Sequence, residues 1–390
     1  MAVSEKMAEI VFWILSGLVG YVYAGYPLAL MLVARMSRGG DLSSDGAAQP
    51  ELPKVSLLIS AYNEAGCIGE KLENTLALDY PRDRLEVLVV SDASNDGTDE
   101  IVQRYAARGV RLLRMPQRGG KTLGLNAAVA QVSGEIVVFS DANALYRSDA
   151  LLRLTAPFAD PRVGAVIGES TYLDSASESA RSESLYWRYE TWIKELESRT
   201  GSVVGGDGAI YAVRRTLYEP MAADALSDFV NPLQVVRAGY RCVYEPAAVS
   251  YEEAAADFRR EYRRKVRIVN RAWRALLSMR EILNPFRYGA FALKLWSHKV
   301  LRWLVPVFLA GILIANAGLL STHPFYTATF VLQGVFYALA AVGLVLRRRP
   351  ALPSIIRVPF YFCMVNFAAA VGLLEAARGK TYTTWTTARA

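Results

Sequence analysis

Long apolar segments lie at both ends of the chain, and they limit the folds that it can adopt. One runs from about Ile10 to Ala34, and others follow after about residue 298. A helix of roughly 20 apolar residues is long enough to cross the hydrocarbon core of a bilayer. Hydrophobic residues make up 53% of the chain, which is high for a purely soluble protein. We therefore expect a protein that is anchored in a membrane.

Basic residues beside these segments predict how the chain is oriented. Arg35 and Arg38 follow the first segment, and the positive-inside rule then places the next region in the cytosol. This segment is longer than a signal-peptide core, so we expect an anchor that is retained. In the C-terminal part we expect spans at about 299–320 and 325–346. The stretch at about 358–377 has basic residues on both sides, which favours a re-entrant segment or a third span.

The placement of charge and the scarcity of histidine exclude several classes of protein. The net charge of +7 arises from short basic runs that adjoin apolar stretches. This placement fits anionic lipid headgroups and phosphorylated substrates better than a nucleic-acid groove. The two histidines, His298 and His323, both lie in the apolar C-terminal part. We expect neither a histidine-dependent triad nor a histidine-rich metal site, so the chemistry must depend on carboxylates.

The central part of the chain alternates between strands and helices. VSLLIS, LEVLVVS and EIVVFSDA are β-branched apolar runs, and each of them ends in polar residues. Stretches that favour helices lie between these runs. The alternation predicts an α/β domain with a mostly parallel sheet that is covered on both faces. Functional side chains should then lie at the carboxyl ends of the strands.

Polar loops follow the first two of these strands. The first loop is AYNEAG, over residues 61–66, and the second is SDASNDGT, over residues 91–98. Asp92 could accept a hydrogen bond from the N3–H of a uracil, Tyr62 could stack on the base, and Glu64 could bind ribose hydroxyls. The alternative is that Asn63, Asp96 and Gly97 in these loops simply form turns and cap helices.

Two further polar segments carry a candidate cation and candidate metal ligands. RGGKT, over residues 118–122, is similar to the end of a P-loop, but Met115 stands where that motif needs a glycine. Lys121 could still lie near the base or the diphosphate, and the alternative is an ordinary surface lysine. Asp141 and Asn143 follow the strand EIVVF, two residues apart. Their oxygens could face one hard cation, because Mg²⁺ or Mn²⁺ prefers such ligands and bridges them to phosphates.

Two later motifs complete the set of candidate residues. GGDG, which contains Gly206 and Asp207, has closely spaced glycines that indicate close backbone approach to a bound sugar or acceptor. Asp228 lies between the apolar residues Leu226 and Phe229, which predicts partial burial. A buried carboxyl suits a general base because burial raises its pKa toward the working pH. The alternative role for Asp228 is to cap the helix that follows it.

In this order and spacing, AYNEAG, SDASNDGT, SDAN, GGDG and SDF resemble the family 2 inverting glycosyltransferases of the GT-A fold. The flanking apolar segments are similar to those of the synthases of cellulose, hyaluronan and related exopolysaccharides. The resemblance is close over residues 53–275 and concerns only the layout of the membrane part. It implies an α/β GT-A nucleotide-sugar-binding domain, Rossmann-like, with flanking transmembrane α-helices. We expect a multi-pass protein of the cell (inner) membrane with a cytosolic catalytic domain.

The resemblance also implies roles for individual residues. Asp228 would be the catalytic base, and Arg267 would assist the departure of the diphosphate. Asp141 and Asn143 would bind Mg²⁺ or Mn²⁺, with D-x-N in place of the usual D-x-D. The expected substrate contacts are Ala61, Tyr62, Glu64, Asp92, Lys121, Gly206, Asp207 and Arg264.

A second departure from the family concerns its Q-x-x-R-W signature, which is replaced here by residues 264–268. The arginine is kept as Arg267, whereas the glutamine and the tryptophan are absent. Because Ile268 offers no aromatic ring on which an acceptor sugar could stack, we expect short or single-sugar products. Trp273, one turn further along, could replace the missing tryptophan. The alternative for this basic helix is a stripe that binds lipid headgroups.

We expect five parts: a transmembrane anchor (1–36), a linker (37–53), the catalytic domain (54–256), basic and amphipathic interface helices (257–298) and a C-terminal transmembrane region (299–390). The expected function is inverting transfer of a sugar from a UDP-sugar to an acceptor hydroxyl, in polysaccharide or glycolipid synthesis. The expected partners are the donor, a carbohydrate or lipid-linked acceptor and membrane lipids, with no nucleic acid. The alternatives are addition of one sugar to a lipid-linked acceptor and, from another class, a membrane transporter with a regulatory nucleotide-binding domain.

Overall fold

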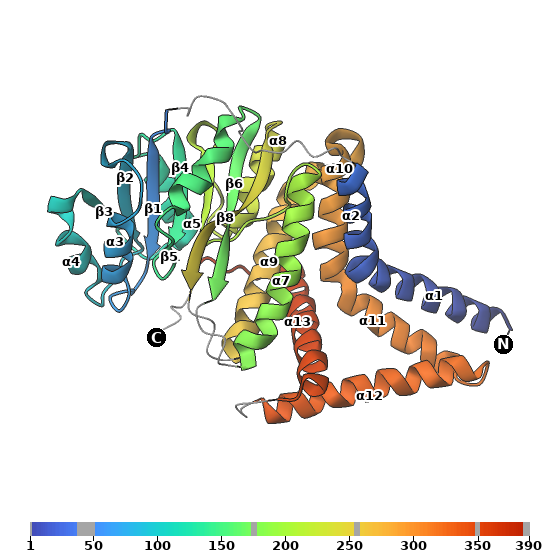
Figure 1. Cartoon of the computed structure of the whole chain (residues 1–390). Helices are drawn as coiled ribbons and strands as arrows, with labels where there is room; N and C mark the ends of the chain where they lie inside the picture. Colours follow the sequence, from blue (N-terminus) through green and yellow to red (C-terminus); the bar gives the residue numbers. More distant parts are fainter. Residues whose placement is uncertain (1, 37–50, 173–177, 253–257, 348–351, 385–390) are drawn as a thin grey trace.

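The computed structural model describes residues 2–36, 51–172, 178–252, 258–347 and 352–384. Within these ranges, an α/β domain packs against a group of long helices that extend away from it (Figure 1). Most of the linker that we expected over 37–53 lies outside the described residues.

The α/β domain is built on one sheet, whose strands are β1 (Val55–Ala61), β2 (Leu85–Ser91), β3 (Val110–Arg114), β4 (Ile136–Asp141), β5 (Leu145–Tyr146), β6 (Val163–Tyr172), β7 (Tyr211–Arg214) and β8 (Arg241–Glu252). Their order is β3-β2-β1-β4-β7-β6-β8-β5. The first four strands in this order are parallel to one another. β7 is antiparallel to both β4 and β6, β6 is parallel to β8, and β5 is antiparallel to β8.

The parallel half contains the three strands that the apolar runs predicted, and it confirms the α/β domain. The second half is mixed, and its long strands carry polar residues that break the apolar pattern. Ser170 of β6 and Ser250 of β8, for example, are both buried, and their hydroxyls lie 3.2 Å apart. A buried pair of this kind satisfies its own hydrogen bonds inside the sheet, so the strands need no continuous apolar run.

Helices cover both faces of the sheet, as expected. The helices of this domain are α3 (Ile68–Leu76), α4 (Thr98–Gln103), α5 (Lys121–Val129), α6 (Ala150–Thr155), α7 (Glu178–Arg199) and α8 (Ser227–Arg237). Successive side chains of a strand point to opposite faces of the sheet. Along β1, Leu57 and Ile59 therefore belong to the apolar core under α3, α4 and α6, whereas Leu58 belongs to the core under α5. Short 3-10 helices lie at Arg82–Arg84, Ala106–Arg108, Ala156–Ala159, Arg215–Leu217 and Arg280–Leu283.

Four helices among the described residues are long and apolar enough to cross a membrane: Ser4–Met36, Pro285–Gly318, Pro324–Leu346 and Ser354–Ala377. The first comprises α1 (Ala2–Gly20), the π-helical η1 (Tyr21–Gly25) and α2 (Tyr26–Met36); the second comprises α10 (Pro285–Leu295), the π-helical η7 (Trp296–Val300) and α11 (Leu301–Gly318); the others are α12 (Pro324–Leu346) and α13 (Ser354–Ala377). Many of their large apolar side chains are exposed, as a lipid-facing surface requires. The five-part division of the chain and the number of true spans stay predictions.

α9 (Phe258–Ser278) lies between the sheet domain and the long helices (Figure 1). Gly372 of α13 packs so closely on α9 that a Cβ at this position would lie 2.8 Å from the carbonyl oxygen of Val266. Beyond α13 the chain turns back, and Asn270 Nδ2 donates a hydrogen bond of 3.1 Å to the carbonyl oxygen of Lys380. The segment after α13 therefore returns to α9, and its Thr383 contacts Gly120.

Candidate active site

Three charged side chains that the sequence singled out converge on Gly208. A Cβ at Gly208 would lie 3.2 Å from Lys121 Nζ, 3.5 Å from Asp141 Oδ2 and 3.8 Å from Asp228 Oδ2. Lys121 also forms an ion pair with Asp141. These groups come from the start of α5, the end of β4 and the first turn of α8, so the fold brings them together across more than 100 residues. Because Gly208 has no side chain, it leaves room for these three charged groups.

Asp228 has the electrostatic properties of a proton acceptor. Burial raises the pKa of its carboxyl to about 6, Asp207 and Asp141 act in the same direction, and Lys121 opposes the shift. A carboxyl with a pKa near 6 is ionised at neutral pH and still binds a proton well, as general-base catalysis requires. The carbonyl oxygen of Asp228 accepts a hydrogen bond of 2.8 Å from the amide of Gly206, which ties the GGDG loop to the start of α8.

Lys121 is a partly buried cation at the centre of this group. Burial alone would lower the pKa of its ammonium, but Asp141, Asp228 and Glu252 together outweigh burial, so the pKa is raised. Lys121 Nζ also lies 3.4 Å from the carbonyl oxygen of Gly208. The reading of Lys121 as an ordinary surface lysine therefore does not fit its position.

Glu252, at the end of β8, is a carboxyl that sequence reasoning missed. Burial raises its pKa to about 8, and the carboxylates of Asp207 and Asp141 act in the same direction. Its only sequence signal is its position at the end of a strand, and β8 was not among the predicted strands. Glu252 therefore adds a fourth acidic side chain within electrostatic reach of Asp141.

Lys71 is a second residue that the sequence did not single out. It is fully buried, it donates a hydrogen bond to the carbonyl oxygen of Ala144, and its ammonium lies 3.8 Å from the centre of the Tyr146 ring. Burial lowers the pKa of this lysine to about 7, whereas Asp141 and Glu252 act to raise it. Through its hydrogen bond to Ala144, the buried Lys71 thus stabilises the turn that contains Asn143.

The carboxylates fit the chemistry of a hard divalent cation, although the described residues contain no three Asp, Glu, His or Cys side chains placed to hold a metal by themselves. Asp141 and Asp207 are close enough to Glu252 to help raise the pKa of its carboxyl. A cation would relieve this repulsion. Mg²⁺ is often held by one or two carboxylates together with substrate phosphates, so a complete protein cage is not required. The ligand role of Asn143, in the turn after Asp141, stays a prediction.

The loops after β1 and β2 are joined by hydrogen bonds. The amide of Asp92 donates to the carbonyl oxygen of Ala61 at 2.9 Å, and the amide of Asn63 donates to Ser94 Oγ at 3.1 Å. The amide of Glu64 donates to Thr98 Oγ1 at 2.8 Å. The two loops in which we expected nucleotide contacts therefore lie side by side, while the contacts themselves stay predictions.

Asp92 binds the loop that precedes α5. Its two carboxylate oxygens accept hydrogen bonds from the amides of Gly119 and Gly120, at 2.7 and 2.9 Å. The guanidinium of Arg118, in the same loop, lies 3.9 Å from the centre of the Tyr62 ring and covers one of its faces. A base that stacks on Tyr62 would need the opposite face. Asp92 retains unused lone pairs, so its predicted contact with a base remains chemically open.

α9 brings several arginines toward this site. The pKa of Arg267 is lowered by burial and then by Arg264, and Asp141 acts in the opposite direction, so Arg267 lies within electrostatic reach of Asp141. Arg264 Nε donates to Glu261 at 2.7 Å. Arg271 donates to the carbonyl oxygen of Ala225 and, at 3.1 Å, to Thr122 Oγ1. Arg271 thus fastens α9 to the segments that carry Asp228 and Lys121.

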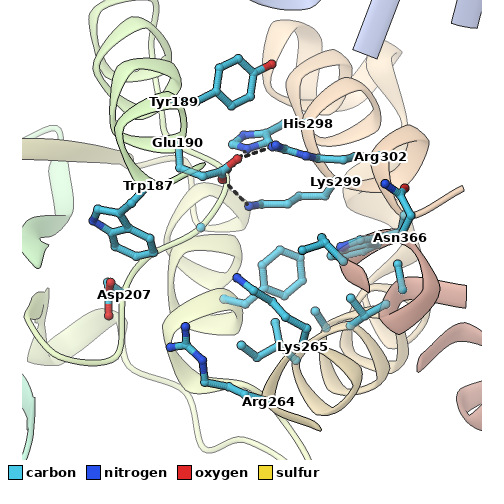
Figure 2. Close-up of a pocket in the computed structure, with 18 of the residues that line it drawn as sticks. Trp187, Tyr189, Glu190, Asp207, Arg264, Lys265, His298, Lys299, Arg302 and Asn366 are labelled. Carbon is cyan, nitrogen blue, oxygen red and sulfur yellow. Dashed lines mark hydrogen bonds and ion pairs between the residues drawn. The ribbon is translucent and has the colours of Figure 1, made fainter. Parts of the chain in front are cut away.

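A cavity of about 500 Å³ extends from these residues toward the long helices (Figure 2). Gly206, Asp207 and Asp228 line one end of it, and Arg264 and Ile268 of α9 line one wall. The other lining residues come from η1, α7, the start of α8, α9, η7 and α11, and α13. Sequence reasoning missed this cavity because it forms only where many separate segments of the chain pack together.

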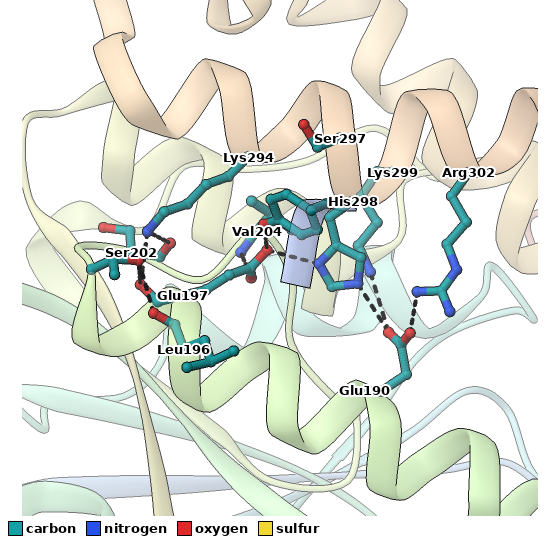
Figure 3. A network of polar contacts seen from close by, with 12 residues as sticks. Glu190, Leu196, Glu197, Ser202, Val204, Lys294, Ser297, His298, Lys299 and Arg302 are labelled. Atoms are coloured by element: carbon teal, nitrogen blue, oxygen red, sulfur yellow. Dashed lines mark hydrogen bonds and ion pairs between the residues drawn. The ribbon is translucent and has the colours of Figure 1, made fainter. Parts of the chain in front are cut away.

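A buried polar network lies beside the cavity (Figure 3). His298 Nδ1 is 2.8 Å from Glu197 Oε1, and His298 Nε2 is 3.1 Å from Glu190 Oε2. Arg302 forms an ion pair with the other oxygen of Glu190, and Lys299 Nζ lies 4.0 Å from Glu190. The network joins α7 to η7 and α11, so it fixes the α/β domain to one of the long helices.

Comparisons with known proteins agree with this geometry. Residues 56–220 match the family model described as Glycosyl transferase family 2. The chain is similar to "Probable glycosyltransferase YdaM" of Bacillus subtilis, with 28% identity over 56% of this chain and 54% of that protein. It is also similar to a beta-monoglucosyldiacylglycerol synthase of Synechocystis, with 38% identity over 32% of this chain and 27% of that protein. The matched part thus spans about half or less of these curated relatives.

A solved structure matches over a larger part of the chain. It is a mannosyltransferase from Pyrobaculum calidifontis in complex with GDP-Man and Mn²⁺. The TM-score is 0.71 at 25% sequence identity, and the match covers 95% of this chain and 99% of that one. The likeness therefore includes both the α/β domain and the long helices, and it confirms the expected fold.

Proposed function

We propose that this chain, which matches the family model Glycosyl transferase family 2 over residues 56–220 and has the fold of a solved mannosyltransferase, is an inverting, membrane-bound glycosyltransferase. It transfers a sugar from a UDP-sugar to an acceptor hydroxyl in the synthesis of a glycolipid or a polysaccharide. The observation that carries this proposal is the convergence of Lys121, Asp141 and Asp228 on Gly208. A base, a cation and a candidate metal ligand then lie around one point that no side chain fills.

In the proposed reaction, Asp228 takes the proton of the acceptor hydroxyl while the acceptor oxygen attacks the anomeric carbon. The bond between that carbon and the diphosphate oxygen breaks, and its electron pair leaves with the diphosphate. Lys121 and Arg267 offset the negative charge that develops on the leaving group. Because the attack occurs in one displacement from the opposite side, the configuration at the anomeric carbon inverts. The carboxyl of Asp228 needs no further partner for this step.

We also propose that Asp141 and Asn143 hold Mg²⁺ or Mn²⁺ together with the donor's diphosphate. Such a cation would supply electrostatic stabilisation to the departing phosphate oxygens. The support is the concentration of acidic side chains near Asp141, since Asp141 and Asp207 both act on the carboxyl of Glu252. The related mannosyltransferase was solved with Mn²⁺.

The donor's base is part of the proposal. The contacts proposed for a uracil are Asp92, Tyr62 and Glu64, with the backbone at Ala61 beside them. The related mannosyltransferase binds GDP-Man, so a guanine base is the main competitor. We further propose that the catalytic domain faces the cytosol at the inner membrane, since Arg35 and Arg38 follow the first apolar helix.

One experiment tests the activity and the donor together. Protein purified in detergent is incubated with Mn²⁺, a bacterial lipid extract and, in turn, UDP-glucose, UDP-N-acetylglucosamine and GDP-mannose. We expect release of UDP and labelling of a lipid or saccharide product with at least one UDP-sugar, and neither with Asp228→Asn. Consumption of GDP-mannose alone would overturn the proposed base. If the protein binds nucleotide but consumes none of the donors, the proposed activity is wrong.

A further inference from the structure

The cavity of about 500 Å³ has three chemically different regions. At one end lie Asp207 and Asp228, which belong to the proposed catalytic group. Cationic side chains line its middle, and apolar side chains of α13 line its far end. A volume of this size is typical of a site for one small ligand or for the head of a larger one. The order acidic, cationic, apolar indicates the chemistry of the molecule that fits.

Lys299 is the most informative residue of the middle region. Its ammonium projects across the cavity toward Glu190, at 4.0 Å, which is the longest ion pair of that cluster (Figure 2). Glu190 is contacted more closely by His298, at 3.1 Å, and by Arg302. The negative charge of Glu190 is thus shared by several groups, and Lys299 is the one that it holds least tightly. An anion in the cavity could be bound by Lys299 without breaking the Glu190–Arg302 pair.

The opposite wall of the middle region is also cationic. Arg264 and Lys265 of α9 both line the cavity, and both contact Glu261, at 2.7 and 3.3 Å. Two walls that face each other therefore present cations from different elements, η7 and α9. Charge-assisted hydrogen bonds from two sides are the usual way in which proteins bind a phosphate.

The cationic region lies directly beside the proposed base. A Cβ at Gly205 would meet Lys299 Cε at 3.6 Å and Nζ at 3.9 Å, and a Cβ at Gly206 would meet the carbonyl oxygen of Asp228 at 2.9 Å. Neighbouring glycines thus contact the side chain of Lys299 and the backbone of Asp228, and both residues line the same cavity. A ligand whose anionic group binds Lys299 could extend along this cavity toward Asp228.

The far end of the cavity is suited to hydrocarbon. Tyr361, Phe362, Val365 and Ala369 line it, and all four lie on α13, one of the helices long and apolar enough to cross a membrane. Apolar groups bound here would continue into the surface of that helix. Arg357 and Asn366 of the same helix also line the cavity, so a hydrocarbon chain would lie along Phe362, Val365 and Ala369.

We propose that the cavity binds a membrane lipid that carries a phosphate in its headgroup. The phosphate lies between Lys299 and the cations of α9, a hydroxyl beyond it reaches Asp228, and the hydrocarbon chain lies along α13. The inference rests on the proposed function, and it specifies the acceptor as an anionic phospholipid or a lipid-linked saccharide phosphate. A neutral glycolipid has no anionic group that these cations could bind.

Titration of purified protein with lipids, followed by native mass spectrometry, tests the site. The probes are phosphatidylglycerol, which has a phosphate and hydroxyls, and monoglucosyldiacylglycerol, which has hydroxyls and no phosphate. We expect one phosphatidylglycerol to bind at least about tenfold more tightly than the neutral glycolipid, as charge-assisted hydrogen bonds predict. Lys299→Gln should remove this preference, and Lys299→Arg should keep most of it. Arg287→Gln, which changes an exposed arginine of α10, should bind as wild type does.

Several outcomes would overturn the lipid site. They are equal binding of the two lipids, unchanged binding in Lys299→Gln, and an equal loss in Arg287→Gln. Glycerol phosphate distinguishes a free phosphate from a lipid: if it displaces phosphatidylglycerol at equal concentration, the hydrocarbon end contributes nothing and the proposal fails. Val365→Trp fills the apolar end and leaves the cations intact, so it should weaken lipid binding without affecting glycerol phosphate. This variant keeps the test decisive if Lys299→Gln does not fold.

Donor consumption separates this proposal from the one on which it rests. Protein that consumes a nucleotide sugar, but binds lipids without regard to Lys299, would overturn the lipid site alone. Protein that binds phosphatidylglycerol through Lys299, but consumes no nucleotide sugar, would overturn the proposed activity and leave the lipid site standing.

Discussion

The carbonyl oxygen of Thr383 lies directly against Gly120, so a Cβ at Gly120 would collide with it. Gly120 also has φ 95° and ψ 157°, a combination that is nearly confined to glycine. The glycine therefore lets the segment after α13 lie across the loop that Asp92 holds before Lys121. Two residues that are 263 positions apart in the sequence thus meet at the proposed donor site.

Gly120→Ala should weaken nucleotide binding and turnover together, because the substituted loop must move away from Thr383 or from Asp92. Backbone strain alone would cost roughly 1–3 kcal/mol, and the collision adds to it. Isothermal titration with UDP and a thermal melt would measure both effects. Gly109→Ala is the control, since Gly109 also has a positive φ but no atom within 4 Å of its Cβ position. Equal behaviour of the two variants would show that contact with Thr383 is unimportant.

Asp228→Asn should abolish transfer and leave UDP binding close to that of the wild type. The amide keeps the shape of the side chain but cannot take a proton, and loss of a general base typically costs on the order of 10²–10⁴ in rate. Steady-state kinetics together with UDP titration would check both parts. If the variant kept more than about a tenth of wild-type turnover, Asp228 would not be the general base.

The pH profile should report the same carboxyl. The pKa of Asp228 is raised to about 6, and only the ionised form accepts a proton, so kcat/KM should fall as the pH drops through about 6. Asp207 raises this pKa and Lys121 lowers it. Asp207→Asn should therefore move the acid limb to lower pH, and Lys121→Gln should move it to higher pH. The position of the limb is the readout, because both variants will also change the rate; shifts in the same direction would contradict the assignment.

The sequence was sufficient to place Asp92, Asp141 and the glycosyltransferase motifs because they follow apolar, β-branched strands. Parallel strands bring their carboxyl ends to one edge, so residues at three strand ends were bound to meet. The fold class followed from the same pattern. β6 and β8 did not give that signal, since buried serines such as Ser170 and Ser250 interrupt their apolar sequence.

Other parts of the site depend on contacts that no local pattern encodes. Glu252 ends a strand that the sequence did not reveal, and Lys71 is a lysine in an amphipathic helix whose full burial only the packing shows. In the sequence, Lys299 is simply a charged residue beside an apolar segment, yet in the fold it lies next to Gly205 of the α/β domain. Thr383 meets Gly120 only because α13 returns the chain to α9. Each of these residues reaches the candidate site or the cavity beside it only through tertiary contacts.

Asp141→Ala should remove activity and metal-dependent donor binding together, whereas Asn143→Asp should be tolerated. An amide oxygen and a carboxylate can both bind Mg²⁺ or Mn²⁺, but loss of the charged ligand leaves the donor's phosphates poorly neutralised. Titration of UDP binding with Mn²⁺ in the two variants tests this. If Asp141→Ala bound the metal as tightly as the wild type does, the metal would lie elsewhere.

The last prediction concerns the two roles that remain open for α9, diphosphate stabilisation and attachment to lipid headgroups. Arg267 lies within electrostatic reach of Asp141, so Arg267→Ala should cut turnover sharply. The variant should stay in the membrane fraction, because four apolar helices remain to hold it there.

Arg259→Ala, at the start of the same helix, should change neither property and serves as the control. Products should be short or single sugars, since Ile268 lines the cavity where the family has a tryptophan. Trp273 packs edge to face with Trp303, their ring centres 6.1 Å apart, which leaves it poorly placed to hold a sugar chain. Polymer of many sugars that is lost in Trp273→Ala would contradict this expectation and would assign the acceptor platform to Trp273.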